Sequence, residues 1–89
     1  MSIELYSSRF CGYCVMAQRL LDSKNLPYTV YHIDSEAGRR EEMQQRSNGQ
    51  RTVPQIFINN QHIGGYTDLA QLDKEGNLEP LLSAVQTTS

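Results

Sequence analysis

The sequence predicts an α/β fold in which a four-stranded mixed sheet is flanked by helices, in the order β-α-β-α-β-β-α-α. Three observations support this fold class. Short β-branched and aromatic segments alternate with helical stripes in the first half of the chain, residues 55–58 and 62–63 are typical of a hairpin, and leucines recur at helical spacing near the C-terminus. Strands separated by a helix run parallel, whereas a hairpin is antiparallel, so both pairings are expected in one sheet.

The first strand–helix unit occupies the N-terminal part of the chain. Residues 3–6 are expected to form a strand, and residues 13–24 a helix. The apolar side chains of this helix share one face: Met16, Ala17, Leu20 and Leu21. Asn25 and Pro27 follow at once, so we expect them to end the helix.

The second unit begins with a strand over residues 28–33, which are rich in β-branched and aromatic types. Asp34 and Ser35 then favour the N-cap of a helix that runs to about Ser47. This helix has few apolar residues, Met43 among them, so we expect a broad face of it to contact solvent.

The second half of the chain contains the hairpin and two helices. Asn59-Asn60-Gln61 joins the two hairpin strands. Thr67 is expected to cap a helix that ends at Gly76. Spacing of i, i+3, i+4 and i+7 predicts a last amphipathic helix from Leu78, Leu81, Leu82 and Val85. Residues 86–89 are expected to form a frayed tail.

Size and composition limit what the protein does. Eighty-nine residues suit one domain, 1–89, because so short a chain has room for one hydrophobic core. A net charge of -2 provides no basic surface for nucleic acid or an anionic membrane. The sequence contains neither the ~20-residue apolar run of a membrane span nor a secretory signal at its start. We therefore expect a cytoplasmic protein, in a compartment that keeps thiols reduced.

The two cysteines form one motif, Cys11-Gly12-Tyr13-Cys14. A structural disulfide between them would close a very short loop and restrict the unfolded chain little. A zinc site needs about four ligands, and the remaining candidates, His32 and His62, lie outside zinc-finger spacing. The pattern therefore favours a redox-active pair over either alternative, and no metal site is expected.

The cysteine motif lies where the first strand passes into its helix, which makes the two thiols unequal. Unpaired N–H groups at a helix start carry roughly half a positive charge, so they favour a thiolate at Cys11. Such positions bring a cysteine pKa from about 8.5 to roughly 3.5–7.5. Arg9 adds positive charge from the loop, whereas Cys14 lies one turn further in and is expected to stay protonated. Cys11 is thus the expected catalytic nucleophile and Cys14 the resolving thiol.

Two further motifs follow the cysteine pair: Thr52-Val53-Pro54 and Gly64-Gly65-Tyr66-Thr67-Asp68. Together the three motifs resemble those of the glutaredoxins, and more narrowly the short bacterial dithiol glutaredoxins, from Ile3 to about Leu82. The resemblance implies a thioredoxin-like fold with a cis bond before Pro54. It also implies a glutathione-dependent thiol–disulfide oxidoreductase that reduces protein–glutathione mixed disulfides and protein disulfides.

The resemblance further implies which residues bind glutathione. These residues are Arg9, Tyr13, Arg40, Thr52, Val53, Pro54, Gly65, Tyr66, Thr67 and Asp68. The backbone of Val53 is expected to pair with the cysteine of the tripeptide like an added strand. At the start of a helix, Thr67 would hold the γ-glutamyl carboxylate and Asp68 the ammonium, or the two residues only cap that helix. Tyr13 either flanks the tripeptide or is a partly exposed aromatic residue.

Some positions depart from the family pattern. Ser8 stands where many members carry a lysine for the glycine carboxylate of glutathione, so Arg9 or Arg40 is expected to take over that contact. Gly12 stands where many members have proline. Tyr66 replaces the usual Cys or Ser after the two glycines, and we expect it to narrow or roof the groove.

Two other functions remain open from the sequence. The resemblance implies one alternative, because some glutaredoxins with a small residue in place of the motif proline bridge a [2Fe–2S] cluster between two subunits through the nucleophilic cysteine and glutathione. Gly12 is such a residue, and it loosens the helix start. A redoxin fed by thioredoxin reductase is another, although it would not need the site at Thr67 and Asp68. The expected partners are glutathione and disulfide-bonded or glutathionylated client proteins, and the chain is expected to be a monomer that dimerises only around a cluster.

Overall fold

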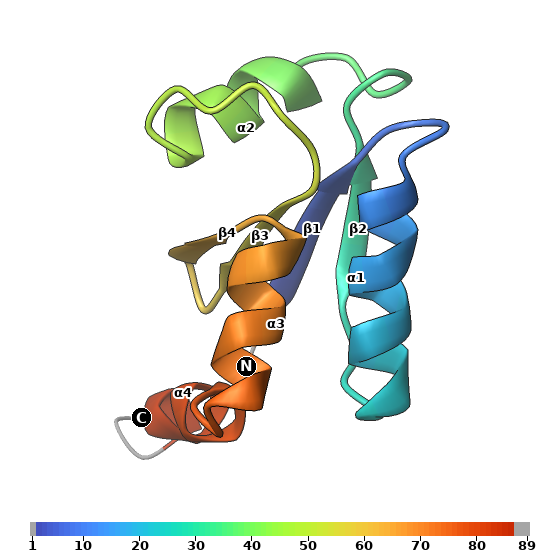
Figure 1. Cartoon of the computed structure of the whole chain (residues 1–89). Helices are drawn as coiled ribbons and strands as arrows, with labels where there is room; N and C mark the ends of the chain where they lie inside the picture. The colour runs from blue at the N-terminus through green and yellow to red at the C-terminus, as the bar shows by residue number, and fades with distance from the viewer. Residues whose placement is uncertain (1, 87–89) are drawn as a thin grey trace.

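The computed structural model describes residues 2–86, and it contains four strands and four helices in the predicted order (Figure 1). The strands are β1 (Ile3–Ser7), β2 (Thr29–His32), β3 (Gln55–Ile58) and β4 (Gln61–Gly64). The helices are α1 (Gly12–Ser23), α2 (Arg39–Arg46), α3 (Tyr66–Lys74) and α4 (Leu78–Gln86). Of the predicted tail, Gln86 lies in α4 and residues 87–89 fall outside the described part of the chain.

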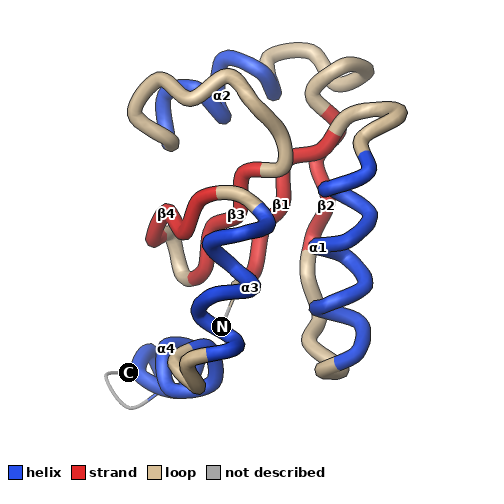
Figure 2. Tube along the Cα trace, in the orientation of Figure 1, coloured by secondary structure: helices blue, strands red, loops and turns tan. Residues whose placement is uncertain are grey.

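The strands form one mixed sheet in the order β2-β1-β3-β4, as Figure 2 shows. β1 runs parallel to β2, with Leu5 opposite Val30, and antiparallel to β3, with Leu5 opposite Ile56. β4 returns antiparallel to β3. The predicted fold class is confirmed, including the parallel first pair and the antiparallel hairpin.

The sheet has a different core on each face because successive side chains of a strand point in opposite directions. Leu5 and Ile56 face α1, α3 and α4, which lie together on one side of the sheet (Figure 1). That core consists of Ile3, Leu5, Ala17, Leu21, Ile56, Ile58, Leu69, Leu78 and Leu82. Tyr6 and Phe57 face the opposite side, where they pack with Met43 of α2 and Ile33.

The start of α2 differs from the prediction, because backbone N–H groups outside the helix bind the carboxylates near its start. Asp34 and Ser35 do not cap this helix; the N-cap is Gly38, with a φ of +82° that glycine adopts easily. The Asp34 carboxylate instead accepts the N–H of Arg9 at 2.9 Å. Glu36 accepts the N–H of His32 at 3.1 Å. Both side chains therefore hold the loop after β2, and the helix begins four residues later than Ser35.

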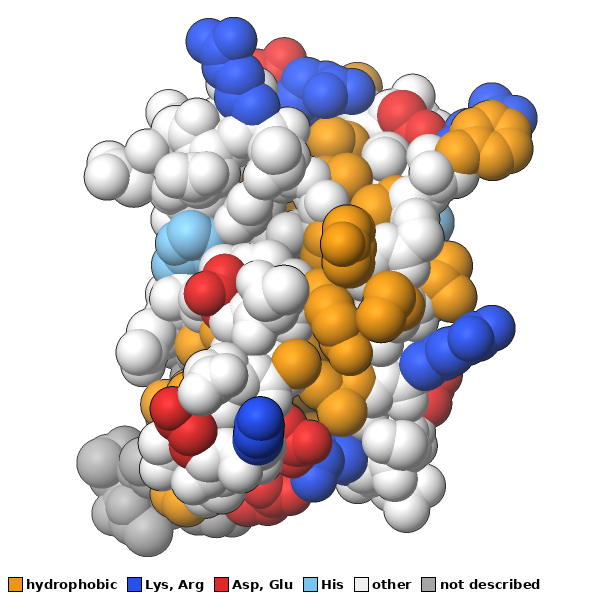
Figure 3. All heavy atoms as spheres, in the orientation of Figure 1, with side chains coloured by type: hydrophobic (Ala, Val, Ile, Leu, Met, Phe, Trp, Pro, Cys, Tyr) orange, Lys and Arg blue, Asp and Glu red, His pale blue; other side chains and the backbone are white. Residues whose placement is uncertain are grey.

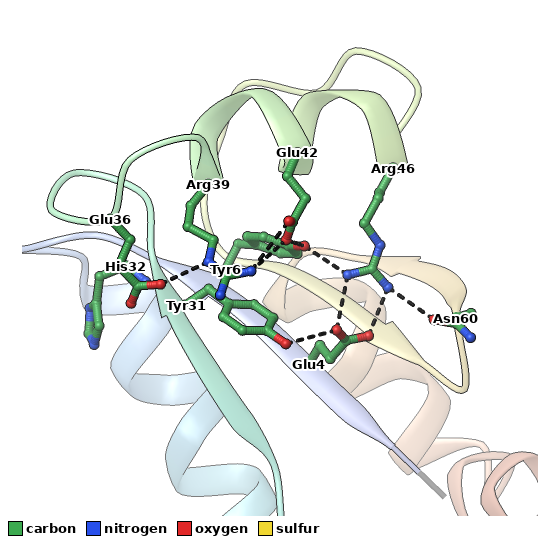
Figure 4. Close-up of polar contacts among 9 residues, drawn as sticks. All are labelled: Glu4, Tyr6, Tyr31, His32, Glu36, Arg39, Glu42, Arg46 and Asn60. Carbon is green, nitrogen blue, oxygen red and sulfur yellow. Dashed lines mark hydrogen bonds and ion pairs between the residues drawn. The ribbon is translucent and has the colours of Figure 1, made fainter.

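Besides the apolar contact of Met43, charged side chains hold α2 against the sheet (Figure 4). Met43 is the buried residue of this helix. Arg46 donates from Nη2 to Glu4 Oε1 at 2.8 Å and from Nη1 to Tyr6 Oη at 2.7 Å. Tyr6 Oη donates in turn to Glu42. The Arg46 guanidinium also lies 4.1 Å from the centre of the Phe57 ring, a distance that favours a cation–π contact.

The turns in the second half of the chain are tighter than predicted. The hairpin turn has two residues, Asn59 and Asn60, both with the positive φ that a type I′ turn requires, and Gln61 already belongs to β4.

The start of α3 also differs from the prediction, because Thr67 does not cap this helix. The N-cap is Gly65, and its N–H donates to the Asp68 carboxylate at 2.9 Å. Thr67 is therefore the second residue of the helix.

None of the helices described is long and apolar enough to cross a membrane.

Candidate active site

The two cysteines lie at the junction between the β1–α1 loop and the first turn of α1. Cys11 is the N-cap residue, with extended backbone at φ −110° and ψ 103°. Its Sγ accepts the backbone N–H of Cys14 at 3.2 Å. The two cysteines are paired as a disulfide with their Cα atoms 5.3 Å apart. Cys14 is 1% exposed, whereas Cys11 is only half-buried. Cys11 is therefore the sulfur that a substrate can reach.

The surroundings of Cys11 favour a negative sulfur once the disulfide is reduced. The first turn of α1 contains no acidic residue, so nothing offsets the partial positive charge of its free N–H groups. The Cys14 N–H already points at Sγ of Cys11. These N–H groups are fixed by the helix, so a thiolate needs no rearrangement of the backbone to be stabilised.

The second motif passes close to Cys11. The Val53–Pro54 peptide bond is cis, as the family resemblance implied. The carbonyl oxygen of Val53 lies 3.7 Å from Cys11 Sγ. The loop before Pro54 thus brings the backbone of Val53 beside the more accessible of the two sulfurs, where it can pair with an extended chain.

A buried glutamine that sequence reasoning missed supports this loop. Gln55 is 3% exposed, and its Nε2 donates to the carbonyl oxygen of Thr52 at 3.0 Å and to the Thr52 hydroxyl at 3.3 Å. The amide oxygen of Gln55 lies 2.6 Å from Nε2 of His62 on the neighbouring strand β4. The sequence could have indicated this role, because Gln55 is a polar residue at a core position of β3 and a buried amide needs hydrogen-bond partners.

The third motif forms the N-terminus of α3. Gly64 has a φ of +122°, and a side chain at this position would clash with the Asp68 carboxylate. A Cβ on Gly65 would lie 3.6 Å from the carbonyl oxygen of Pro54, so the third motif packs directly against the second. The two glycines therefore let α3 begin close to the cis-proline loop.

The three motifs together line one groove of about 400 Å³. Its lining residues are Tyr13, Thr52, Val53, Pro54, Gly65, Tyr66 and Thr67. A second, polar hollow of about 460 Å³ shares Thr52, Gly65 and Thr67 with the groove and adds Asp68, Gln55 and His62. Seven of the ten predicted glutathione-binding residues thus line the groove, and Asp68 lines the hollow beside it.

The two predicted arginines lie elsewhere. Arg9 is exposed, and its guanidinium is 5.7 Å from the ring centre of its neighbour Phe10. The backbone N–H of Arg9 donates a hydrogen bond to Asp34, and this bond keeps the pKa of the Asp34 carboxyl below its usual range. Arg40 lines a separate hollow, together with Glu41 and residues 33–38. Neither arginine is among the residues that line the groove beside Cys11.

Comparison with known proteins identifies the family. The sequence profile of the glutaredoxins matches residues 3–63. The chain belongs to the glutaredoxin family. Glutaredoxin 3 of Escherichia coli (strain K12) is 51% identical over 81 residues, which cover 91% of this chain and 96% of that protein. A glutaredoxin of Neisseria meningitidis is 45% identical over 83 residues, which cover 92% of this chain and 96% of the relative.

Solved structures agree with this family in fold. The buckwheat glutaredoxin–glutathione complex superposes with a TM-score of 0.82 at 32% identity, and the match covers 92% of this chain and 76% of that one. The solution structure of glutaredoxin from Brucella melitensis gives a TM-score of 0.78 at 38% identity, covering 92% and 88%. With both cysteines of its motif present, this glutaredoxin is a glutathione-dependent thiol–disulfide oxidoreductase.

Among the described residues, no group of three or more His, Cys, Asp or Glu side chains is placed to hold a metal ion.

Proposed function

We propose that this glutaredoxin binds glutathione in the groove beside Cys11 and reduces glutathionylated and disulfide-bonded proteins. The observation that carries the proposal is the convergence of three distant motifs on one reactive sulfur. Cys11 Sγ lies 3.7 Å from the Val53 carbonyl oxygen, at the groove that Tyr13 and Thr67 also line. A groove of about 400 Å³ falls within the ordinary range for a small ligand.

The groove offers a partner for two parts of the tripeptide. The backbone of Val53 pairs with the cysteine residue of glutathione and directs its sulfur toward Cys11. The first turn of α3, at Thr67, receives the γ-glutamyl carboxylate, because its N–H groups lack partners within the helix. Asp68 caps this helix through Oδ2, so its second oxygen is available for the γ-glutamyl ammonium.

The glycine carboxylate has no fixed partner in the groove. Arg9 and Arg40 are the two candidates, and both are exposed on long side chains. We assign the contact to whichever of these arginines reaches the groove when glutathione is bound, since Ser8 provides no charge.

Reduction of a mixed disulfide uses Cys11 alone. The Cys11 thiolate attacks the glutathione sulfur, the protein–glutathione S–S bond breaks, and the protein leaves as a thiolate that takes a proton from water. A disulfide between Cys11 and glutathione remains. The thiolate of a second glutathione then attacks the sulfur of the bound glutathione, which releases oxidised glutathione and restores the Cys11 thiolate.

Reduction of a protein disulfide uses both cysteines. Cys11 attacks one client sulfur and releases the other as a thiolate, leaving a mixed disulfide with the client. Cys14 loses its proton and attacks Cys11 Sγ, so the client leaves fully reduced and the Cys11–Cys14 disulfide forms. Two glutathione molecules then reduce that disulfide and leave as oxidised glutathione.

The proposal includes the oligomeric state of the protein, its location and its partners. Residues 1–89 act as one domain, as a monomer in the cytosol. Its partners are glutathione and client proteins that carry a disulfide or a glutathionylated cysteine. Its net charge of -2 provides no general attraction to nucleic acid or to anionic membranes.

A pair of coupled assays tests the proposal. The reduction of a mixed disulfide between glutathione and 2-mercaptoethanol is followed through NADPH, once with glutathione and glutathione reductase and once with thioredoxin reductase alone. We expect turnover in the first assay and only background oxidation of NADPH in the second. Turnover in the second assay with none in the first would contradict the proposal and would make the protein a redoxin independent of glutathione.

A [2Fe–2S] cluster is the second candidate function, and the space around Gly12 favours it. A Cβ built on Gly12 meets nothing within 4 Å, so the helix start beside Cys11 is open. Because Cys14 is 1% exposed, one chain has a single accessible sulfur, and Cys11 from each of two chains with two glutathione molecules would hold the cluster. Anaerobic reconstitution tests this: a coloured dimer supports it, and a colourless monomer contradicts it.

A further inference from the structure

One aromatic ring next to Cys11 is almost wholly exposed. Phe10 lies in the loop between β1 and α1, directly before Cys11, and it is 97% exposed. An apolar side chain stabilises a fold when it is buried, so this ring contributes little to stability. Val15 and Met16 of α1 are exposed as well, and Figure 3 shows hydrophobic side chains in a band on the surface where α1 and α3 lie side by side. The start of α1 therefore presents apolar surface beside Cys11.

The backbone of Phe10 is unfavourable for an aromatic residue. Its φ is +57°, in the left-handed region that bulky side chains rarely adopt and that asparagine or glycine adopts more easily. The residue before it is held in place, because the N–H of Arg9 donates to the Asp34 carboxylate at 2.9 Å. A costly backbone and an exposed ring together indicate that Phe10 serves binding and not folding.

A hollow of about 380 Å³ lies beside Phe10 and reaches both cysteines. Its lining includes Phe10, Cys11, Gly12, Cys14 and Val15. A Cβ on Gly12 would meet nothing within 4 Å, so this part of the surface is open. The hollow shares no lining residue with the groove that we propose for glutathione. Cys11 therefore borders two separate spaces.

The chemistry of this hollow favours a polypeptide over glutathione. The described residues that line it include no Lys, Arg, Asp or Glu, so the charged groups of glutathione would find no ion-pair partner there. When Cys11 attacks a protein disulfide, one client cysteine becomes bonded to Cys11 Sγ. The residues next to that client cysteine must then lie against the surface around Cys11. An apolar side chain can cover the Phe10 ring there without the cost of desolvating a polar group.

From these observations we infer that Phe10 and the hollow beside it form a docking surface for client proteins, one that favours an apolar side chain next to the client's disulfide cysteine. The inference rests on the proposed function, because it needs Cys11 to attack the client. Burial of about half of a phenylalanine side chain corresponds to about threefold to tenfold in an equilibrium.

Two peptide disulfides test the inference. Each joins two copies of a pentapeptide, which has leucine on both sides of its cysteine in one substrate and serine in the other. Their reduction by glutathione is followed through NADPH and glutathione reductase. Each kcat/KM is divided by the rate constant of the same peptide with glutathione alone, which removes differences in intrinsic reactivity.

The variants separate the ring from the backbone. Phe10→Asn removes the ring and suits a positive φ, and Phe10→Gly does the same if Phe10→Asn does not fold. Phe10→Tyr keeps the ring. Met16→Gln is the matched control, because Met16 is an exposed apolar residue that does not line the hollow. The mixed disulfide of glutathione with 2-mercaptoethanol is the reference substrate, because it brings no polypeptide to the hollow.

We expect the wild-type protein to prefer the leucine peptide by about threefold to tenfold. Phe10→Asn is expected to lose this preference, whereas Phe10→Tyr and Met16→Gln are expected to keep it. For the reference substrate, kcat/KM is expected to stay within about twofold of wild type in every variant. Thermal unfolding of Phe10→Asn is expected at the same temperature as wild type or higher, because the strain of the positive φ is relieved.

Three results would overturn the inference. The wild-type protein could show no preference for the leucine peptide, or Phe10→Asn could retain the preference. An equal loss of kcat/KM for all three substrates in Phe10→Asn would indicate distortion around Cys11 instead of a lost client contact. Failure of the proposed function is distinct, because the wild-type protein would then not turn over the reference substrate.

Discussion

The backbone N–H of Cys14 donates to Sγ of Cys11 across one turn of α1, at 3.2 Å. The same contact caps the helix and, once the disulfide is reduced, would stabilise a thiolate at Cys11, the nucleophile that we propose. Because the donor is a backbone group, it does not depend on the side chain of Cys14. The roles of the two cysteine side chains can therefore be tested separately by substitution.

Substitution of each cysteine by serine is expected to give opposite results. Cys11→Ser removes the accessible sulfur and abolishes the reduction of every substrate. Cys14→Ser keeps its N–H beside Cys11 and so retains reduction of glutathione mixed disulfides, while reduction of insulin disulfides falls because Cys14 no longer resolves the mixed disulfide. The NADPH-coupled assay measures both. Undiminished reduction of the glutathione adduct by Cys11→Ser would refute the assignment of the nucleophile.

Substitution of Arg46 is expected to loosen α2. Arg46→Met keeps an apolar stem over Phe57 but leaves Glu4, which is 19% exposed, without its cation. We expect a loss of about 1.5–3 kcal/mol in the free energy of unfolding, because hydrogen bonds to charged groups are lost. Denaturant titration measures this loss. The matched control is Arg19→Met on the exposed side of α1, where a change within about 0.5 kcal/mol is expected, and equal effects would contradict the role of Arg46.

The same contacts predict how stability depends on pH. The Arg46 hydrogen bond lowers the pKa of Glu4, and the hydrogen bond from Tyr6 lowers that of Glu42, both from an ordinary value of 4.5. Their contribution to stability is present above pH 4.5 and is lost as the pH falls through the lowered pKa values. Burial, followed by the bond to Glu42, raises the pKa of Tyr6 from 10.0 to about 12, so its contribution is present below pH 10 and is lost toward pH 12.

Unfolding free energies measured from pH 3 to pH 11 (roughly the accessible range for such titrations) check this prediction. We expect a plateau between the two limits. Glu42→Gln is expected to reduce the slope of the acid limb because one of the two titrating carboxylates is gone and Glu4 remains. An acid limb of unchanged slope in Glu42→Gln would show that this carboxylate is not responsible.

A methyl group at Gly64 is expected to affect the glutathione site through Asp68. Gly64→Ala places a Cβ at a φ of +122°, where it clashes with the Asp68 carboxylate. The strain of a positive φ costs about 1–2 kcal/mol. The displaced carboxylate no longer caps α3, so KM for the glutathione adduct is expected to rise as well.

Gly12→Ala is the control for that substitution, because a Cβ there meets nothing within 4 Å and the residue is helical. We expect Gly12→Ala to leave KM unchanged and to stabilise the protein by up to roughly 1 kcal/mol, the difference in helix propensity between glycine and alanine. A Gly64→Ala protein with wild-type stability and KM would show that Asp68 tolerates the added methyl group.

Local patterns were enough to place the elements that bury an apolar face. The stripe containing Leu20 and Leu21 placed α1 within one residue of its observed ends, because a helix that buries one face must repeat apolar residues at its own period. The short segments 55–58 and 62–63 on either side of the asparagines likewise predicted the hairpin.

The start of α2 could not be predicted in the same way. Asp34 is an excellent N-cap by composition, but in the folded protein its carboxylate accepts the N–H of Arg9, 25 residues away in the chain. Thr67 gave way to Gly65 for a similar reason, because Asp68 caps α3 from within its own first turn. Whether a side chain caps a helix depends on the other N–H groups that can donate to it. A donor that is far away in the sequence cannot be recognised from a local pattern.

By itself the sequence determined the chemistry of this glutaredoxin: a cysteine pair at a strand–helix junction, and two later motifs that belong with it. Helix periodicity and the field of a helix terminus are local properties, so they can be inferred from neighbouring residues. Only the tertiary structure decided which residues meet at the groove. Tyr13 and Tyr66 are 53 positions apart, and the packing of α1 beside α3 stacks their rings at one edge of the groove.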